Sequence, residues 1–192
     1  STMLPFQLGD VDNMGFAHSR LSIVDLQYGS QPAFNEDKSV VVIFNGEIFN
    51  HMQLRKSLEL RGHRITNLSD TAVLPHLYEE YGTGLFERLD GQFSIAIWDS
   101  TKKRLVLARD RFGKLPLFYA TQKDGFIFAS EIKAVLILGD TRPTLSGKVL
   151  HEILTYWAPV GEDSIFENIK MLLPGQWMVY ESGMIRSKRF YQ

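Results

Sequence analysis

The fold is decided by residues 93–108, which read FSIAIWDSTKKRLVLA. Two apolar runs, residues 93–98 and 104–108, flank the small and polar residues 99–103. Short runs rich in β-branched and aromatic residues on either side of such a segment are typical of two strands joined by a turn. This stretch therefore predicts an antiparallel hairpin.

Upstream of this hairpin, residues 40–44 (VVVIF) form a continuous apolar run that predicts a strand buried on both faces. The pair Asn45-Gly46 tolerates left-handed backbone and is expected to end that strand in a turn. A helix is predicted at residues 51–61, because apolar residues recur at helical spacing and Gly62 follows as a stop.

A second helix is predicted before Gly82, after the candidate capping residues 69–71. Pro75 lies too deep for the first turn of a helix that begins at Ser69, since proline lacks the amide hydrogen that an interior turn needs. We therefore expect either a kink at Pro75 or a later helix start.

Downstream of the first hairpin, local strand pairs recur. Two more hairpins are predicted, residues 117–120 with 126–129 and residues 177–180 with 184–190. Short helices are predicted after Ser130, through Leu138, and at residues 146–157. Helices in blocks and strands that pair locally indicate an α+β fold with largely antiparallel sheets.

The composition is that of an ordinary globular domain. Of the 192 residues, 44% are hydrophobic and 22% are charged, and the net charge of −1 implies neither nucleic acid nor an anionic membrane as a partner. Cysteine is absent, which excludes disulfides and thiolate metal sites in these residues and fits a reducing, cytoplasmic location. It also leaves the 192 residues without a cysteine nucleophile.

Eight short motifs then appear in one order along the chain. They are HSRLSIVD (18–25), GSQP (29–32), NGEIFN (45–50), SDT (69–71), LDGQF (89–93), ARDRFG (108–113), FASEIK (128–133) and LPG (173–175). Any one of them is weak, but the ordered set resembles class II glutamine amidotransferases, and asparagine synthetases in particular. The resemblance implies a four-layer αββα sandwich of the N-terminal-nucleophile hydrolase type.

The resemblance also carries expectations about the parent protein. Members of the family begin with a cysteine several dozen residues before the motif that contains Arg20, so a leading segment is expected to be missing and residues 1–192 to be a truncated glutaminase domain. A synthetase domain that uses ATP and magnesium is expected after residue 192, since no phosphate-binding motif appears in this chain. No cofactor is expected in this domain, and a homodimer is left open.

In the family, the N-terminal cysteine attacks the side-chain amide of L-glutamine, and its own α-amine acts as the base. The resemblance places the Asn45 side chain and the Gly46 N–H at the oxyanion. It matches Arg20 to the substrate carboxylate and Asp70 to the substrate ammonium. The residues expected to bind glutamine are Arg20, Leu21, Ser22, Ile23, Val24, Asn45, Gly46, Glu47 and Asp70.

Two positions depart from the family pattern. Ala72 stands where a glutamate usually follows the SDT motif, and residues 113–116 (GKLP) carry their basic residue one place early. Ser1 is a poor candidate for the nucleophile, because a cut end easily leaves a serine first.

Some motif residues have a plainer interpretation. Arg109, Asp110 and Arg111 are expected to form a solvated or salt-bridged structural loop. His18 has no second histidine or carboxylate at the spacing of a metal site, so no metal site is expected.

Three functions remain in competition. The first is the glutaminase domain of an asparagine synthetase-like enzyme, which passes ammonia to the synthetase domain for amidation of aspartate and is inactive without its cysteine. The second is a degenerate support or binding module, as in enzymes that resemble β-lactam synthetase. The third is another class II amidotransferase, making phosphoribosylamine or glucosamine phosphate.

Overall fold

A computed structural model describes residues 4–7, 14–18, 31–123, 125–139 and 143–191. The strands are β1 (Leu4–Gln7), β2 (Gly15–His18), β3 (Ala33–Phe34), β4 (Val40–Ile48), β5 (Gly91–Asp99), β6 (Arg104–Arg109), β7 (Phe118–Gln122), β8 (Gly125–Ala129), β9 (Lys170–Met171), β10 (Gln176–Glu181) and β11 (Met184–Arg189). The helices are α1 (His51–Glu59), η1 (Thr71–Val73), α2 (Leu74–Tyr81), η2 (Gly82–Glu87), α3 (Ile132–Leu138) and α4 (Gly147–Tyr156).

The hairpin predicted from residues 93–108 lies at the centre of the larger sheet. This sheet has six strands in the order β11-β10-β6-β5-β4-β3, and every neighbouring pair is antiparallel. A second sheet has the order β8-β7-β9, and β1 pairs with β2. The three predicted hairpins are all confirmed, β5 with β6, β7 with β8 and β10 with β11.

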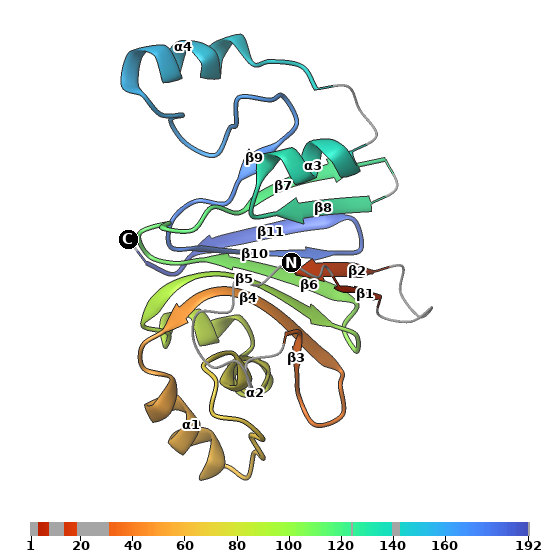
Figure 1. Ribbon diagram of the computed structural model, residues 1–192, viewed down its shortest axis with the longest axis vertical. Coiled ribbons are helices and arrows are strands. Elements are labelled where there is room, and N and C mark those ends of the chain that lie inside the picture. Colours follow the sequence, from red (N-terminus) through yellow and green to blue (C-terminus); the bar gives the residue numbers. More distant parts are fainter. Residues whose placement is uncertain (1–3, 8–13, 19–30, 124, 140–142, 192) are drawn as a thin grey trace.

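The molecule is built of four layers, with helices on the outside and two stacked sheets between them (Figure 1). Helices α1 and α2 cover one face of the six-stranded sheet, and α3 covers the outer face of the β8-β7-β9 sheet (Figure 1). The αββα sandwich implied by the resemblance is therefore the observed fold. No helix among the described residues is long and apolar enough to cross a membrane.

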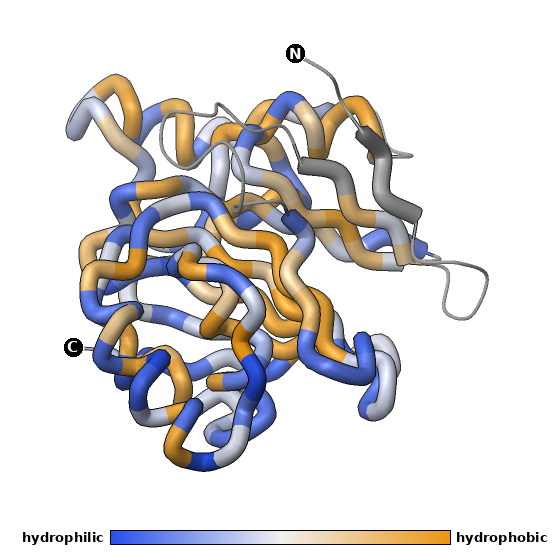
Figure 2. The backbone as a smooth tube through the Cα atoms, turned by 60° about the horizontal axis from the view of Figure 1, so that its bottom comes forward, coloured by the Kyte–Doolittle hydropathy of each residue, from blue (hydrophilic) through white to orange (hydrophobic). Residues whose placement is uncertain are grey.

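Three apolar clusters fill the spaces between these layers. The first lies between the six-stranded sheet and α2, the second lies between the two sheets, and the third lies under α3. The strand β4 contributes to two of them, since Val42 packs on the helical side and Val41 packs between the sheets. The most hydrophobic parts of the chain accordingly lie along the central strands (Figure 2).

Three local predictions are corrected or resolved by the structure. The second helix starts late, with Pro75 in the first turn of α2, so the proline needs no kink. Helix α1 ends at Glu59, two residues before the predicted end, and turns lead on to Gly62. Ser130 does not cap α3, whose N-cap is Glu131 without a side-chain hydrogen bond.

Candidate active site

The strand β4 does not stop at Asn45-Gly46, as the sequence predicted, but continues to Ile48. Both residues stay in register with β5, Asn45 opposite Ser94 and Gly46 opposite Phe93. Asparagine followed by glycine favours a turn only when the chain has no partner strand, and here the ladder with β5 holds the pair extended.

Beyond its short pairing with β3 at Val41 and Val42, the outer edge of β4 pairs with no other strand of the described residues, and we refer to it as the open edge. Side chains satisfy this edge at two places. The Phe44 N–H donates to Gln31 Oε1 at 2.7 Å and the Phe44 carbonyl accepts from Gln31 Nε2 at 2.6 Å. Farther along, the Ile48 N–H donates to Asp70 Oδ2 at 3.0 Å.

Between these two positions lies Gly46. Backbone groups of an antiparallel strand point alternately to its two neighbours, so the Gly46 N–H points to the same open edge as those of Phe44 and Ile48. None of the described residues accepts a hydrogen bond from it on that edge. A backbone donor is thus left aimed outward, between two donors that side chains already satisfy.

Glycine is needed at position 46 for a steric reason. Its φ is +141°, and a Cβ built there would overlap the carbonyl oxygen of Gln92 and lie 2.8 Å from Phe93 Cα. In two antiparallel strands, the backbones come closest at opposite residues that do not exchange hydrogen bonds with each other. The absence of a side chain therefore lets β5 support the backbone that presents the free N–H.

The side chains of Asn45 and Glu47 lie on the face of β4 that looks toward the second sheet. They follow Val41 and Ile43 at a period of two, and both of those residues pack in the cluster between the sheets. Unlike Val41, however, residues 45, 46 and 47 are all exposed. The Asn45 amide is therefore accessible beside the outward N–H of Gly46, as an oxyanion site requires.

Asp70 lies at the far end of this open edge, at the start of η1. Its Oδ1 accepts from the Thr71 N–H at 2.8 Å and its Oδ2 accepts from Ile48, so the carboxylate is held at a fixed place. Gly46 and Ile48 are two residues apart, about 7 Å along a strand. That separation is comparable with the distance between the amide and the α-amino group of an extended glutamine.

Four of the predicted site residues thus come together on one edge of β4, namely Asn45, Gly46, Glu47 and Asp70. The other five, Arg20, Leu21, Ser22, Ile23 and Val24, lie outside the described residues, as do Ser1 and the side chain of His18. The structure therefore describes the amide and ammonium ends of the predicted glutamine site.

The motif at residues 109–111 has the structural role that was predicted, but Arg109 and Asp110 are buried and bound to backbone groups rather than solvated or salt-bridged. Arg109 is 6% exposed, and its guanidinium donates to the carbonyls of Leu115 at 2.7 Å, Leu172 at 2.9 Å and Gly113. Burial lowers the pKa of Arg109, and the nearby charge of Asp110 opposes that shift.

Asp110 is 1% exposed and holds the same loop from within. Its carboxylate accepts from the backbone N–H groups of Phe112 at 2.8 Å, Lys114 at 3.0 Å and Phe93 at 3.3 Å. Together with Arg109 it fixes the connection from β6 to β7 through backbone contacts rather than through salt bridges.

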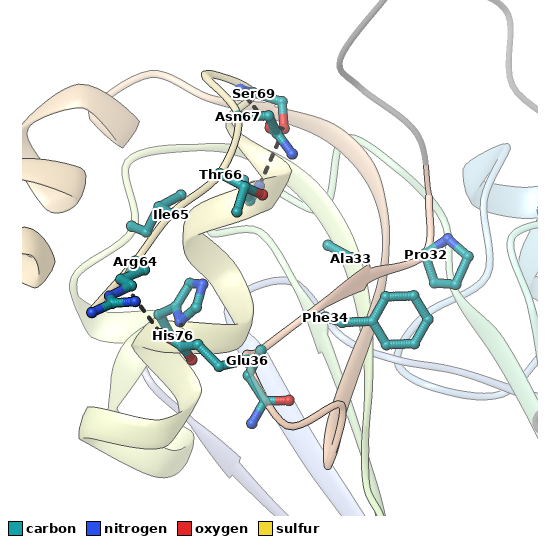
Figure 3. A pocket seen from close by; sticks show the side chains of 12 residues that line it. Pro32, Ala33, Phe34, Glu36, Arg64, Ile65, Thr66, Asn67, Ser69 and His76 are labelled. Carbon is teal, nitrogen blue, oxygen red and sulfur yellow. Dashed lines mark hydrogen bonds and ion pairs between the residues drawn. The ribbon is translucent and has the colours of Figure 1, made fainter. Parts of the chain in front are cut away.

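A cavity of about 460 Å³ opens beside β3 and α2 (Figure 3). Its walls include Phe34, Asn67, Ser69, Ala72 and His76. Ala72, which replaces the usual glutamate, therefore faces this cavity. Asn45, Gly46, Glu47 and Asp70 do not line it, so the cavity is separate from the predicted glutamine site.

Sequence reasoning missed one polar cluster altogether. The cluster consists of Glu36, His63, His76 and Glu79. One nitrogen or oxygen atom of each side chain that could bind a metal ion lies within 4.8 Å of the others, on the helical side of the six-stranded sheet. Three separate segments bring them together, so their spacing in the sequence gives little sign of it. The one local signal is that His76 and Glu79 are three residues apart on α2, and so share a helix face.

Comparison with protein-family models matches residues 8–191 to a glutamine amidotransferase domain. Asparagine synthetase [glutamine-hydrolyzing] 2 from Bacillus subtilis is 52% identical over 122 residues, covering 64% of this chain and 16% of that protein. Asparagine synthetase [glutamine-hydrolyzing] 3 from the same organism is 35% identical over 179 residues, covering 92% of this chain and 29% of that protein. The chain thus spans less than a third of the length of either relative.

Solved structures share the fold at low sequence identity. Glutamine phosphoribosylpyrophosphate amidotransferase from B. subtilis aligns with a TM-score of 0.56 at 23% identity, over 83% of this chain and 31% of that one. An allosteric regulatory enzyme of purine biosynthesis aligns with a TM-score of 0.59 at 22% identity, over 85% of this chain and 31% of that one. These structural similarities show only that the fold is shared.

Proposed function

Because the chain belongs to the family of glutamine amidotransferase domains, we propose that it binds glutamine at the open edge of β4 as part of a glutamine-hydrolysing asparagine synthetase. One observation carries this proposal. The Gly46 N–H is aimed outward beside the exposed Asn45 amide, between edge positions that Gln31 and Asp70 already satisfy. These are the two donors that an amide-derived oxyanion needs.

The chemistry also needs a thiolate, and the 192 residues contain no cysteine. Hydrolysis therefore depends on an N-terminal cysteine supplied from outside these residues, and the chain alone is inactive. In the complete reaction the cysteine α-amine takes the thiol proton, the thiolate attacks the side-chain amide carbon, and the developing oxyanion accepts hydrogen bonds from Asn45 and Gly46. The protonated α-amine then gives its proton to the amide nitrogen, which leaves as ammonia. Water then cleaves the thioester and releases glutamate.

Substrate selection follows from the two charged groups on the α-carbon of glutamine. Asp70, fixed by Ile48 and Thr71, offers its remaining lone pairs to the α-ammonium. Arg20 is proposed to bind the α-carboxylate bidentately. Leu21, Ser22, Ile23, Val24 and Glu47 complete the proposed wall. Recognition of both charged groups on the α-carbon favours a free amino acid over a peptide.

The choice of asparagine synthetase rests on sequence similarity. The relatives at 52% and 35% identity are asparagine synthetases, whereas the phosphoribosylpyrophosphate amidotransferase shares the fold at 23%. Under this proposal the ammonia passes to a synthetase domain that uses ATP and magnesium to activate aspartate. Another class II amidotransferase is the weaker alternative.

A second function is favoured by the missing thiol. In a degenerate module, the domain would keep its fold and support a partner domain without hydrolysing glutamine. A glutamine titration of the native full-length protein, with ammonia release measured in parallel, separates the two. Ammonia release supports the glutaminase. Absence of both binding and release at millimolar glutamine supports the degenerate module.

The oxyanion assignment is tested by Asn45→Ala in the native full-length protein. Loss of one such donor typically lowers kcat by about 100- to 1000-fold, and KM changes little because the donor acts mainly on the transition state. Gln53→Ala, which removes an exposed amide from α1, is the matched control and leaves both constants unchanged. An Asn45→Ala enzyme with unaltered kcat would remove Asn45 from the catalytic machinery.

A further inference from the structure

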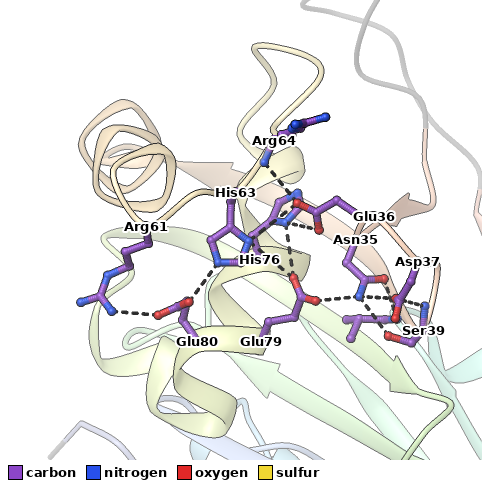
Figure 4. A network of polar contacts seen from close by, with 11 residues as sticks. Asn35, Glu36, Asp37, Ser39, Arg61, His63, Arg64, His76, Glu79 and Glu80 are labelled. Atoms are coloured by element: carbon purple, nitrogen blue, oxygen red, sulfur yellow. Dashed lines mark hydrogen bonds and ion pairs between the residues drawn. The ribbon is translucent and has the colours of Figure 1, made fainter.

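The polar cluster on the helical side of the six-stranded sheet joins three segments of the chain. Glu36 comes from the loop between β3 and β4, His63 from the segment after α1, and His76 and Glu79 from α2 (Figure 4). No part of the proposed glutamine chemistry uses these four side chains.

The distances in the cluster fit a tetrahedral ion. His76 Nδ1 lies 3.3 Å from Glu36 Oε2 and 3.4 Å from Glu79 Oε2. His63 Nδ1 lies 3.8 Å from Glu36 Oε1 and 3.8 Å from Glu79 Oε2. With zinc–ligand bonds of about 2.0–2.2 Å, neighbouring ligand atoms of a tetrahedron are about 3.3–3.6 Å apart. The two distances from His76 Nδ1 match these values, whereas those from His63 Nδ1 are longer and the four ligand atoms as a set lie within 4.8 Å of one another, so side-chain rotation would be needed to close the site around an ion.

The second observation is a buried ring nitrogen that lies at ion-pair distance from two carboxylates but makes no hydrogen bond within the described part of the chain. His76 is 3% exposed, and its Nδ1, which faces both carboxylates, makes no hydrogen bond with any described residue. A buried polar atom without a partner costs about 1–3 kcal/mol, so native proteins rarely keep one without a reason. A bound cation would satisfy it.

The outer contacts orient the ligands as the partners of metal sites commonly do. His63 Nε2 lies 3.0 Å from Glu80 Oε1, and Glu80 in turn binds Arg61 Nη1 at 2.8 Å. When Nε2–H donates to Glu80, the Nδ1 lone pair of His63 is turned toward the cluster. This is the carboxylate–histidine arrangement found behind metal-binding imidazoles.

The two carboxylates are oriented in the same way. Glu36 Oε1 accepts from the Arg64 N–H at 3.1 Å, and Glu79 Oε1 accepts from Asn35 Nδ2 at 2.8 Å. In each case the other oxygen, Oε2, faces His76. Glu79 therefore keeps one oxygen for the protein and directs the other into the cluster, whereas Glu36 Oε1, which accepts from Arg64, also lies 3.8 Å from His63 Nδ1.

We propose that Glu36, His63, His76 and Glu79 form a site for one divalent transition-metal ion of the zinc type. Two neutral imidazoles and two carboxylates balance the charge of such an ion. Magnesium and calcium prefer oxygen ligands alone, whereas imidazole nitrogens select zinc, cobalt, nickel or copper. The ion enters from solvent, since the side chains of Glu36 and Glu79 are 45% and 32% exposed.

The ion would connect α2 to the loop after β3 and to the segment after α1, a structural role close to η1, which carries Asp70.

The rival account is a network of ion pairs, in which protonated histidines neutralise the carboxylates and no metal binds. Zinc titration of the 192-residue chain without an affinity tag, followed by calorimetry at pH 7, separates the two. The proposal requires one ion per chain. Cobalt at the same site should give the intense visible absorption of a tetrahedral complex.

The variants His63→Gln and Glu36→Gln each remove one ligand from a partly exposed position and should weaken zinc binding at least about 100-fold. Glu80→Gln, which removes only the outer partner of His63, should weaken it about 10- to 100-fold. The matched controls are His151→Gln on α4 and Glu87→Gln on η2, both exposed and outside the cluster, and they should bind as the wild type does.

Far-UV circular dichroism shows whether each variant keeps the fold, and His76 is left intact because its burial makes substitution disruptive. Wild-type affinity no higher than that of His63→Gln would overturn the proposal, as would an equal loss in His151→Gln. Zinc binding in the wild type that is lost in both ligand variants and kept in both controls supports it.

Discussion

One row of the central sheet holds two regions that use polar groups in opposite ways. Asn45 on β4, Ser94 on β5 and Arg109 on β6 lie opposite one another across three adjacent strands. At the β6 end, Arg109 is buried and donates to three backbone carbonyls. At the β4 end, Asn45 is exposed, and its neighbour Gly46 has an N–H that no described residue accepts on the open edge.

This difference distinguishes a motif that stabilises the fold from one that is proposed to bind a ligand, although both are polar motifs in the sequence. Where the protein itself supplies the hydrogen-bond partners, as it does for the Arg109 guanidinium and the Asp110 carboxylate, substitution should cost stability. Where donors are held rigidly but remain available, as at Asn45 and Gly46, substitution of a side chain should cost activity. Measurements on both ends of the row can confirm or break this distinction.

The largest effect on stability is expected for Arg109→Met. The loop between β6 and β7 would lose its buried donor. The carbonyls of Leu172 and Gly113 would lose the side chain that binds them, and that of Leu115 would keep only the Ser94 hydroxyl. We expect the free energy of unfolding to fall by about 3–5 kcal/mol. Urea unfolding measures it. Arg186→Met, at an exposed position paired with Glu181, should change it by less than about 0.5 kcal/mol.

Gly46→Ala tests the backbone at the open end of the row. A Cβ there would overlap Gln92 O and approach Phe93 Cα to 2.8 Å, at a φ of +141°. Strain and overpacking together should lower the free energy of unfolding by about 2–4 kcal/mol. Gly125→Ala on β8 meets no atom within 4 Å and is the matched control. A stable Gly46→Ala variant would contradict the close approach of β4 and β5.

Ser94→Ala lies in the middle of the row and should have a smaller effect. Ser94 is buried, and its hydroxyl donates to the carbonyls of Leu115 and Pro116, both at 3.2 Å. Its loss should destabilise the fold by about 1 kcal/mol in the same urea experiment. Ser57→Ala on the exposed face of α1 should have no measurable cost. Equal effects at the two serines would mean that the Ser94 contacts contribute nothing.

Much of this fold could be predicted from the sequence, since its hairpins are local. The runs at residues 93–98 and 104–108 pair through a short turn, and the delayed start of α2 follows from Pro75 alone. The error at Asn45-Gly46 has a physical reason. Turn preference is a local property, whereas the extended backbone there depends on β5, which is more than 40 residues away in the chain.

The candidate site stays a prediction from motif resemblance, and its geometry could not be predicted from the sequence. The sequence pairs Asn45 with Asp70 only as motif members, whereas the hydrogen bond from Ile48 to Asp70 defines the edge they share. The cluster around His76 lay beyond sequence reasoning, because Glu36 and His63 reach it from separate loops. Convergence of distant segments is a tertiary property, and spacing along the chain does not encode it.

The smallest expected change in stability is the most informative, and it belongs to Asn45→Ala. Because Asn45 is exposed on β4 and its side chain makes no hydrogen bond with the described residues, its removal should alter the free energy of unfolding by less than about 0.5 kcal/mol. The same variant is expected to lose about 100- to 1000-fold in kcat. Unfolding and kinetics are measured on one preparation of the native full-length protein. A loss of stability as large as that of Arg109→Met would make Asn45 a structural residue, and the contrast between the two ends of the row would fail.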